Sequence, residues 1–173
     1  GSLNSQLVDI DRKVYFQLQS FLNHSDNNYW MDAVPLTDDN GNVIDDSYRT
    51  RRFHDDYSST MLSASLGFYD NSLADDWKVK VTYGSNRKNY QHPDFNIKRV
   101  FGKFATEEST VLASTEYKKT IGALRLNAFL LAGRSREVIS DTSTFRYNWA
   151  GEAIDRLALD PDDPKGELNE RRS

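Results

Sequence analysis

The chain has 173 residues, of which 38% are hydrophobic, 28% charged and 12% aromatic, and its formal net charge is −4. The aromatic content excludes a disordered chain, the charge indicates no nucleic-acid partner, and the absence of cysteine excludes disulfides and thiolate metal sites. No run of about 18 apolar residues occurs. This excludes a transmembrane helix but leaves a transmembrane β-barrel open, because barrel strands alternate.

Five segments alternate apolar and polar residues with the period of two that is typical of β-strands. In one of them, Trp77 and Val79 would face one side of a sheet and Lys78 the other. In chain order the segments span approximately 12–24, 59–70, 76–86, 109–119 and 122–138. A weaker strand is predicted at 97–104. The predicted fold class is therefore all-β, an antiparallel meander of about five to six strands.

The predicted strands are joined by connections of two different lengths. Long polar loops span 25–58, 87–108 and 139–152, whereas the other connections are short turns. Successive connections of an antiparallel meander lie at opposite ends of the sheet, so the long ones share one end, as they do in outer-membrane barrels. A soluble β-sandwich shows the same strand alternation. The long loops disfavour a sandwich, but the strand pattern alone leaves both interpretations open.

One structural region is expected from residue 3 to residue 152, a partial transmembrane β-barrel with its long loops on one end. Residues 153–173 are expected to form a polar C-terminal tail or a continuing extracellular loop, with one helical turn near 150–159. The opening residues resemble the remnant of a cleaved tag, and the final residues are charged and unpatterned. We therefore interpret the chain as a piece of a longer protein.

Three short stretches carry a resemblance to a known family: SDNNYWMD at 25–32, RRFHDDY at 51–57 and RYNWAGE at 146–152. In this order, and with this strand spacing, they resemble the TonB-dependent outer-membrane receptors of the Bacteroidetes type over about 14–152. The resemblance implies a β-barrel in the cell outer membrane, with an N-terminal plug and a periplasmic TonB box. Such receptors take up scarce nutrients, namely iron chelates, haem, cobalamin or glycans, with energy delivered through TonB.

The chain shows neither plug nor TonB box, so the resemblance implies that it contributes barrel wall and extracellular ligand-facing loops. The implied partners are a small-molecule nutrient, TonB through the missing plug region, and outer-membrane lipid. No cofactor and no enzymatic activity are expected. An isolated piece of such a wall is expected to self-associate, because its apolar face and its edges are bare. The alternatives are a soluble all-β ligand-binding module, for instance for carbohydrate, and an adhesive surface protein.

Aromatic and basic side chains in the long connections are the candidate ligand-binding residues, because loops carry function and aromatic rings suit flat ligands. They are Tyr29, Trp30, Arg52, His54, Tyr57, Tyr147 and Trp149. The alternative role of the aromatic residues is to anchor the chain, either at a membrane interface or within the loops. No nucleophile motif and no phosphate-binding loop occurs, so no catalytic residue is predicted.

Two further groups have metal-ligand chemistry. The acidic and amide residues of 38–45 offer hard oxygen atoms around a glycine, but the glutamate that closes an EF-hand loop is missing, and an Asn-Gly turn explains the same residues. His24, His54 and His92 lie in the long connections without metal-binding spacing. We expect surface histidines and a polar turn, and we predict no metal site.

Overall fold

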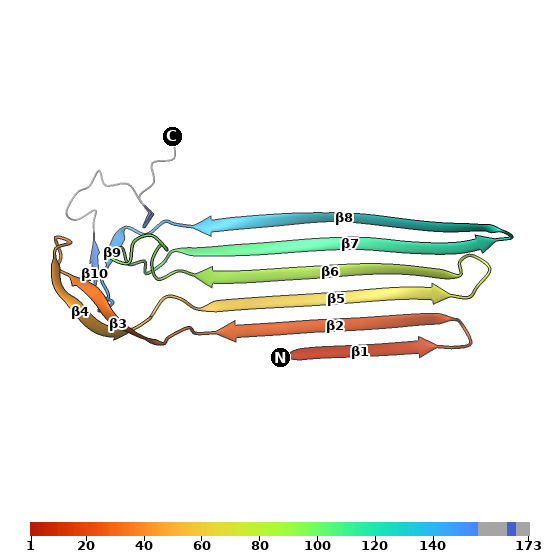
Figure 1. Cartoon of the computed structure of the whole chain (residues 1–173), viewed down its shortest axis with the longest axis horizontal. Coiled ribbons are helices and arrows are strands. Elements are labelled where there is room, and N and C mark those ends of the chain that lie inside the picture. Colours follow the sequence, from red (N-terminus) through yellow and green to blue (C-terminus); the bar gives the residue numbers. More distant parts are fainter. Residues whose placement is uncertain (156–165, 169–173) are drawn as a thin grey trace, which may run out of the picture. The chain divides into compact units, whose positions relative to one another are not determined.

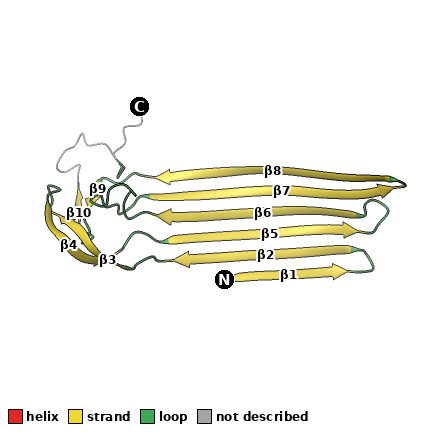
Figure 2. Ribbon diagram, viewed as in Figure 1, coloured by secondary structure: helices red, strands yellow, loops and turns green. Residues whose placement is uncertain are grey.

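The computed structural model describes residues 1–155 and 166–168. Within them the chain forms ten strands and no helix (Figure 2). Nothing in this described part is a helix long and apolar enough to cross a membrane. The chain divides into two compact units, which we call the sheet unit and the loop unit. The sheet unit comprises Gly1–Asn23, Ser59–Asn86 and Glu108–Glu137; the loop unit comprises His24–Ser58, Arg87–Glu107 and the described residues from Val138 onward.

A six-stranded antiparallel sheet with the order β1-β2-β5-β6-β7-β8 dominates the fold (Figure 1). Its strands are β1 (Ser2–Asp9), β2 (Val14–Ser25), β5 (Tyr57–Tyr69), β6 (Asp76–Asn89), β7 (Ala105–Ile121) and β8 (Leu124–Ser140). The sheet is not closed into a barrel, so β1 and β8 are its two edges. The prediction of an all-β antiparallel meander is thus confirmed.

The structure differs from the predicted elements in three places. Strand β1 was not predicted; it pairs with β2 from Ser2↔Phe21 to Asp9↔Val14. The loop predicted at 25–58 contains a hairpin of β3 (Trp30–Thr37) and β4 (Val43–Arg51). The strand predicted at 97–104 is absent: of these residues, only Val100 makes an isolated bridge, to Tyr147.

The C-terminal region contains a short hairpin where a helical turn was expected. Strand β9 (Phe145–Tyr147) pairs with β10 (Ala153–Asp155) in an antiparallel register. Ala150 and Gly151 belong to the turn of this hairpin and 153–155 are extended, and the rest of the expected turn at 150–159 lies outside the described residues.

The polar face of the sheet is held together by side chains that contact one another across strands. Ser63 Oγ of β5 lies 3.0 Å from Thr82 Oγ1 of β6. Ser65 Oγ donates to Gln17 Oε1 of β2 at 3.3 Å, and Gln17 donates in turn to Gln6 of β1 at 3.3 Å. Small residues on β5 thus let longer polar side chains of neighbouring strands close over them.

The opposite face of the sheet is apolar and exposed to solvent. In β6 the apolar residues from Trp77 to Tyr83 are exposed, while the polar residues between them are half-buried. Leu62 is 46% exposed and Leu66 40%, whereas Ser63 between them is only 4% exposed. This is the reverse of the arrangement in which an amphipathic sheet buries its apolar face against a second layer.

Short turns connect the strands at one end of the sheet (Figure 1). Strands β7 and β8 are joined by Gly122 and Ala123, and Gly122 has a φ of 61°. A positive φ at the first of two turn residues is the arrangement that suits the twist of a hairpin and that favours glycine. Between β5 and β6, Lys13 of the neighbouring turn donates from Nζ to the backbone oxygen and to Oδ2 of Asp70, each at 2.6 Å.

The loop unit has its own small core. Val34 and Trp149 are completely buried and Val100 is nearly so, and these three pack together. The indole Nε1 of Trp149 donates to the backbone oxygen of Ile97 at 2.9 Å, which satisfies its one polar atom. The core is built from residues far apart in sequence, because each of the three long connections contributes apolar side chains to it.

Candidate functional site

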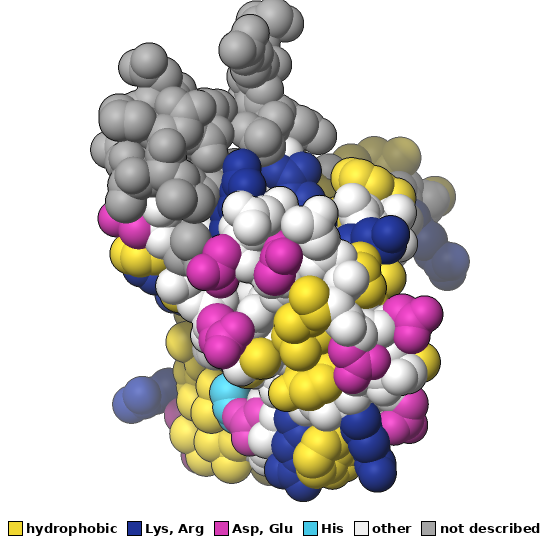
Figure 3. Space-filling view, turned by 90° about the vertical axis from the view of Figure 1, so that its left-hand side faces the viewer, with side chains coloured by type: hydrophobic (Ala, Val, Ile, Leu, Met, Phe, Trp, Pro, Cys, Tyr) yellow, Lys and Arg dark blue, Asp and Glu magenta, His cyan; other side chains and the backbone are white. Residues whose placement is uncertain are grey.

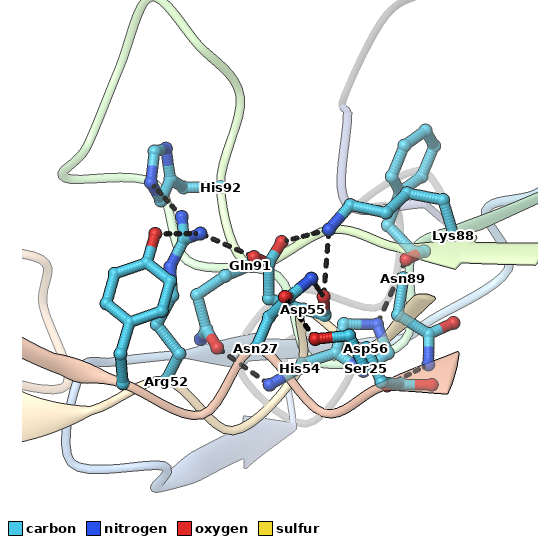
Figure 4. A network of polar contacts seen from close by, with 12 residues as sticks. Ser25, Asn27, Arg52, His54, Asp55, Asp56, Lys88, Asn89, Gln91 and His92 are labelled. Carbon is cyan, nitrogen blue, oxygen red and sulfur yellow. Dashed lines mark hydrogen bonds and ion pairs between the residues drawn. The ribbon is translucent and has the colours of Figure 1, made fainter. Parts of the chain in front are cut away.

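The carboxylate of Asp55 lies at the centre of a polar network in the loop unit (Figure 4). Lys88 Nζ donates to Asp55 Oδ1 at 2.8 Å, and Arg52 Nη1 donates to Asp55 Oδ2. Asn27 Nδ2 and Lys88 Nζ also donate to the backbone oxygen of Asp55, each at 2.8 Å. The side chain of Asp55 is only 9% exposed, so this charge is stable there because two cations surround it.

The guanidinium of Arg52 joins three segments of the loop unit. Besides Asp55, Arg52 Nη1 donates to Tyr29 Oη at 2.9 Å, and Nη2 lies 2.7 Å from His92 Nε2. Because arginine can only donate, His92 Nε2 is an acceptor here, and the ring proton sits on Nδ1, which lies 2.9 Å from the backbone oxygen of Pro93. These two contacts fix the orientation of the His92 ring between Arg52 and the backbone of Pro93.

A completely buried glutamine, Gln91, shapes the segment that follows Arg52. Its Oε1 accepts hydrogen bonds from the backbone nitrogens of Phe53 and His54, each at 2.8 Å. His54 Nε2 lies 3.0 Å from the backbone oxygen of Phe104, so the imidazole is also used to hold the loops together. Within the described residues, Gln91 Nε2 and Arg52 Nε are buried without a hydrogen-bond partner.

Two of the candidate ligand-binding residues present exposed rings beside arginines. Tyr29 is 54% exposed and Trp30 51%. The guanidinium carbons of Arg49 and Arg51 lie 4.9 Å and 5.1 Å from the centroid of the Trp30 ring, and that of Arg52 lies 5.2 Å from the centroid of Tyr29. These are cation–π distances, and about half of each of the two aromatic residues remains exposed to solvent.

The other aromatic candidates are more enclosed. Trp149 is completely buried in the core of the loop unit, so its place is structural rather than on a ligand-facing surface. Tyr147 is half-buried and its ring covers Gly102, where an added Cβ would lie 2.5 Å from the ring atoms. Tyr57 is half-buried at the start of β5. The structure thus brings Tyr29, Arg52 and His54 into one network and places Tyr147 and Trp149 in and around the core.

Two hollows lie on the loop unit. One, of about 400 Å³, is open and is lined by His24, Asp26, Asn28, Arg52, Phe53 and Asp56. The other, of about 300 Å³, lies among the tip of the β3–β4 hairpin (residues 37–41), the turn at 96–100, and β9. We call the second one the hairpin groove. The groove could not be predicted from the sequence, because its lining comes from separate segments that share no motif.

The surface drawn in Figure 3 is chemically mixed. On the face drawn in Figure 3, acidic, basic and hydrophobic side chains lie next to one another. This contrasts with the sheet unit, where hydrophobic residues occupy one face. Such a mixture is typical of a surface that meets water and polar ligands.

The described residues contain no group of three or more histidine or acidic side chains placed to hold a metal ion. Asp38, the first residue of the candidate Ca²⁺ loop, is instead used by the turn. Its Oδ1 accepts hydrogen bonds from the backbone nitrogens of Asn42 at 2.8 Å and Asn40 at 2.9 Å. These bonds, together with one from the side chain of Asn42, lower the pKa of Asp38.

No family model, no curated protein and no solved structure matches this chain.

Proposed function

We propose that this chain forms part of the wall of an outer-membrane β-barrel. The barrel belongs to a receptor of the TonB-dependent type that takes up a scarce nutrient, and the loop unit contributes to its extracellular, ligand-facing surface. The observation that carries the proposal is the exposed apolar face of the six-stranded sheet. In the functional protein, an apolar sheet face of this kind is covered by a second layer of the same chain, by another molecule or by lipid. The features described below favour lipid as the layer that covers the apolar face.

On the apolar face, each of three neighbouring strands has an uncharged stretch of the length that a membrane-spanning strand requires. Among the side chains on this face, none is charged from Trp77 to Ser85 in β6, from Ser109 to Tyr117 in β7, or from Leu124 to Ala132 in β8. A tilted strand needs roughly 9–11 residues to cross the hydrocarbon core, which matches each of these intervals. Charges return on the same face beyond them, at Lys119 and Arg134.

A row of aromatic rings lies on the same face near the short turns. The ring of Trp77 lies 5.8 Å from that of Phe68 and 6.4 Å from that of Tyr117, measured between centroids, so the row crosses β5, β6 and β7. Trp77 Nε1 donates to Thr115 Oγ1 at 2.9 Å, and Tyr117 Oη donates to the backbone oxygen of Leu73 at 2.6 Å. Rings with a satisfied polar end are what the interfacial girdle of a membrane barrel contains.

The opposite face has the chemistry of a water-filled interior. Ser63, Ser65, Gln17 and Thr82 are linked by hydrogen bonds across the strands, and Lys80 of β6 lies on the same side. A barrel lumen is lined by polar side chains, because they remain in contact with water. A barrel wall would therefore explain both faces of β6: the apolar residues would face lipid and the polar residues would face water.

Nutrient uptake enters the proposal through the connections. The stretches at 25–32 and 51–57, which resemble those of TonB-dependent receptors, contact each other through Arg52 and Tyr29 and through Asn27 and Asp55. Exposed rings beside arginines, at Tyr29 and Trp30, offer contacts for a small polar ligand. Loops held by a buried ion pair present such groups in a defined arrangement, which is what a ligand site needs.

The proposal is tested by measuring which face of β6 meets lipid. The chain has no cysteine, so Val81→Cys and Lys80→Cys each introduce a single site for a fluorescent label. The two positions are adjacent in the strand and differ only in the face they occupy. In vesicles of phosphatidylcholine with brominated acyl chains, we expect strong quenching of a label at 81 and weak quenching at 80. Equal quenching at both sites, or none at 81, overturns the proposal.

Sedimentation velocity provides an independent measurement on the unlabelled chain. We expect large and polydisperse species in buffer that become small in mild detergent, because detergent replaces self-association on the apolar face. A compact monomer that is indifferent to detergent contradicts the lipid-facing role. That result would favour a soluble ligand-binding module instead.

A further inference from the structure

Strand β8 lies at an edge of the six-stranded sheet and carries an inference that does not rest on the wall function. Within the described residues, β8 has a neighbouring strand, β7, on one side only (Figure 1). We propose that two copies of this chain pair antiparallel along β8, about a two-fold axis at Leu131, and so form one continuous sheet. The backbone, the charges and the apolar side chains of β8 each support this pairing.

The backbone groups of β8 that point away from β7 belong to its odd-numbered residues. The two-residue turn of Gly122 and Ala123 makes its flanking residues, Ile121 and Leu124, a hydrogen-bonded pair. Hydrogen-bonded and non-hydrogen-bonded positions alternate along an antiparallel pair, so the even-numbered residues of β8 bond to β7. In the described part of the chain, the odd-numbered residues therefore present N–H and C=O groups to which a further strand can bond.

The charges of β8 are complementary in one register. Its single acidic residue, Glu137, and Arg125 lie on the same face, are exposed, and form no ion pair or side-chain hydrogen bond with another described residue. About an axis at Leu131, Arg125 of each copy lies opposite Glu137 of the other, because both are equally far from the axis. Opposite residues share a face, so the even-numbered Arg134 and Arg136 never lie opposite Glu137. Only the axis at 131 therefore pairs Glu137 with an arginine.

The middle of β8 is apolar on both faces, and an exposed apolar edge strand is a place where another chain pairs. Phe129, Leu130 and Leu131 are 64%, 66% and 56% exposed. Phe129 and Leu131 lie on the polar face of the sheet, so a water-filled interior does not account for them. In the proposed register Leu131 lies opposite its own copy. Phe129 lies opposite Gly133, which has no side chain to crowd the ring.

No like charges lie opposite each other in this register. On the apolar face Arg134 lies opposite Ala128, and Arg136 lies opposite Leu126 in the same way. The other edge strand, β1, has eight residues, and its only charged one is Asp9, so two β1 strands offer each other no ion pair. In a closed barrel the edge of β8 would meet a neighbouring strand instead, so self-pairing and barrel closure are alternative uses of this edge.

Nitroxide spin labels on single cysteines test the register, because the chain has no cysteine of its own. Leu131→Cys, Asn127→Cys and Ser135→Cys are labelled and measured in mild detergent, which covers the apolar face. We expect a dimer with strong dipolar broadening for the label at 131. The labels at 127 and 135 should each give an intermolecular distance of about 27 Å, the span of about eight residues at a rise of ~3.4 Å. These two distances are equal only when the axis lies at 131.

A label at Val81→Cys in β6 is the control for association through the apolar face. It should show no broadening, because β6 lies two strands inside the edge. A monomer in detergent overturns the proposal. So does a dimer in which the distances at 127 and 135 differ, or in which broadening is stronger at 81 than at 131.

Charge-swap variants test the ion pair that sets the axis. Arg125→Glu and Glu137→Lys each place like charges opposite each other twice in the dimer, so each should weaken dimerisation roughly five- to thirtyfold. The double variant recreates the pair with exchanged signs and should restore the affinity. Lys80→Glu in β6 changes the net charge by as much as Arg125→Glu and should leave dimerisation unchanged. Failure of the double variant to restore the affinity overturns the proposal.

The pairing and the wall function can be rejected separately. A dimer paired through β8, without lipid quenching at position 81, supports the pairing and rejects the wall function. Lipid quenching at 81 by a chain that is monomeric in detergent does the reverse.

Discussion

The ring of Tyr15 in β2 lies directly over Gly67 in β5, so that a Cβ added at Gly67 would lie 1.9 Å from Tyr15 Cζ. Gly67 is buried, like Ser63 and Ser65 on the same polar face of β5, and at Gly67 the cover is this ring. The contact links the ends of two neighbouring strands close to the short turns, where Tyr15 also lies 6.4 Å from the ring of Tyr69. A glycine is required here by the close approach of a side chain, not by its backbone angle.

Gly67→Ala is therefore expected to displace the Tyr15 ring and to lower the free energy of unfolding by about 1–3 kcal/mol, the range for overpacking a well-packed site. Urea unfolding in detergent measures the change. Gly84→Ala is the matched control: Gly84 lies in β6 of the same sheet, and an added Cβ there meets nothing within 4 Å. That variant should be neutral or slightly stabilising, because alanine restricts the unfolded chain more than glycine does.

A double-mutant cycle separates the ring contact from a general intolerance of β5. In a Tyr15→Ala background, Gly67→Ala has no ring to displace and should no longer destabilise the chain. If Gly67→Ala costs the same free energy with and without Tyr15, the ring contact is not the reason for the glycine.

Asp55→Asn should destabilise the loop unit by about 3–5 kcal/mol, because it leaves Arg52 and Lys88 in a mostly buried environment without their counter-charge. Asp32→Asn is the control. Asp32 pairs with Arg49 at 2.9 Å, but both side chains are largely exposed, so the loss should be below about 1 kcal/mol. Thermal or urea unfolding of the two variants gives the comparison. Equal effects would mean that the Asp55 network does not organise the loops.

Much of the sheet could be predicted because an amphipathic strand repeats every two residues, as Trp77, Val79 and Val81 do in β6. Strand β1 lacks that contrast, since polar residues occupy both of its faces, and its pairing with β2 comes from backbone hydrogen bonds. The β3–β4 hairpin was missed for another reason. Its register shifts between Met31 and Val34, where Ala33 has a φ of 59°, so the alternation is interrupted.

The candidate site could be predicted only in part. Arg52 and His54 stand out in sequence because a charged or aromatic residue in a loop has recognisable chemistry. Gln91 carries no such signal, although it is completely buried and holds the backbone of Phe53 and His54. The same limit applies to the hairpin groove: its lining depends on which segments meet, and a single sequence does not contain that information.

The tip of the β3–β4 hairpin should depend on pH through Asp38. Hydrogen bonds from Asn42 lower the pKa of Asp38 below its ordinary value, so the folded state favours the carboxylate. The stabilisation is present above the pKa of the unfolded chain, near 3.8, and is lost as the pH falls through the lowered pKa of the folded state. Asn42→Ala removes the side-chain donor and should raise the pKa of Asp38 part of the way back. NMR titration of the labelled carboxyl group measures it; an unchanged pKa would contradict the assigned cause.

Two tryptophans that look alike in sequence should respond differently to substitution. Trp149→Ala removes a completely buried ring that packs on Val34 and Val100, and large-to-small changes of this kind cost about 3–5 kcal/mol. Trp30→Ala removes a ring that is 51% exposed and contacts arginines, so its cost should be about 1 kcal/mol or less. Urea unfolding followed by circular dichroism compares the two variants.

The same pair distinguishes a structural role from a ligand-binding role. If a ligand is found for the exposed rings, Trp30→Ala should weaken its binding while the unfolding midpoint stays nearly constant. Trp149→Phe, which keeps most of the buried ring but loses the hydrogen bond to Ile97, should lower the midpoint and leave the affinity of the folded chain unchanged. A loss of affinity in the folded Trp149→Phe variant would place Trp149 in contact with the ligand after all.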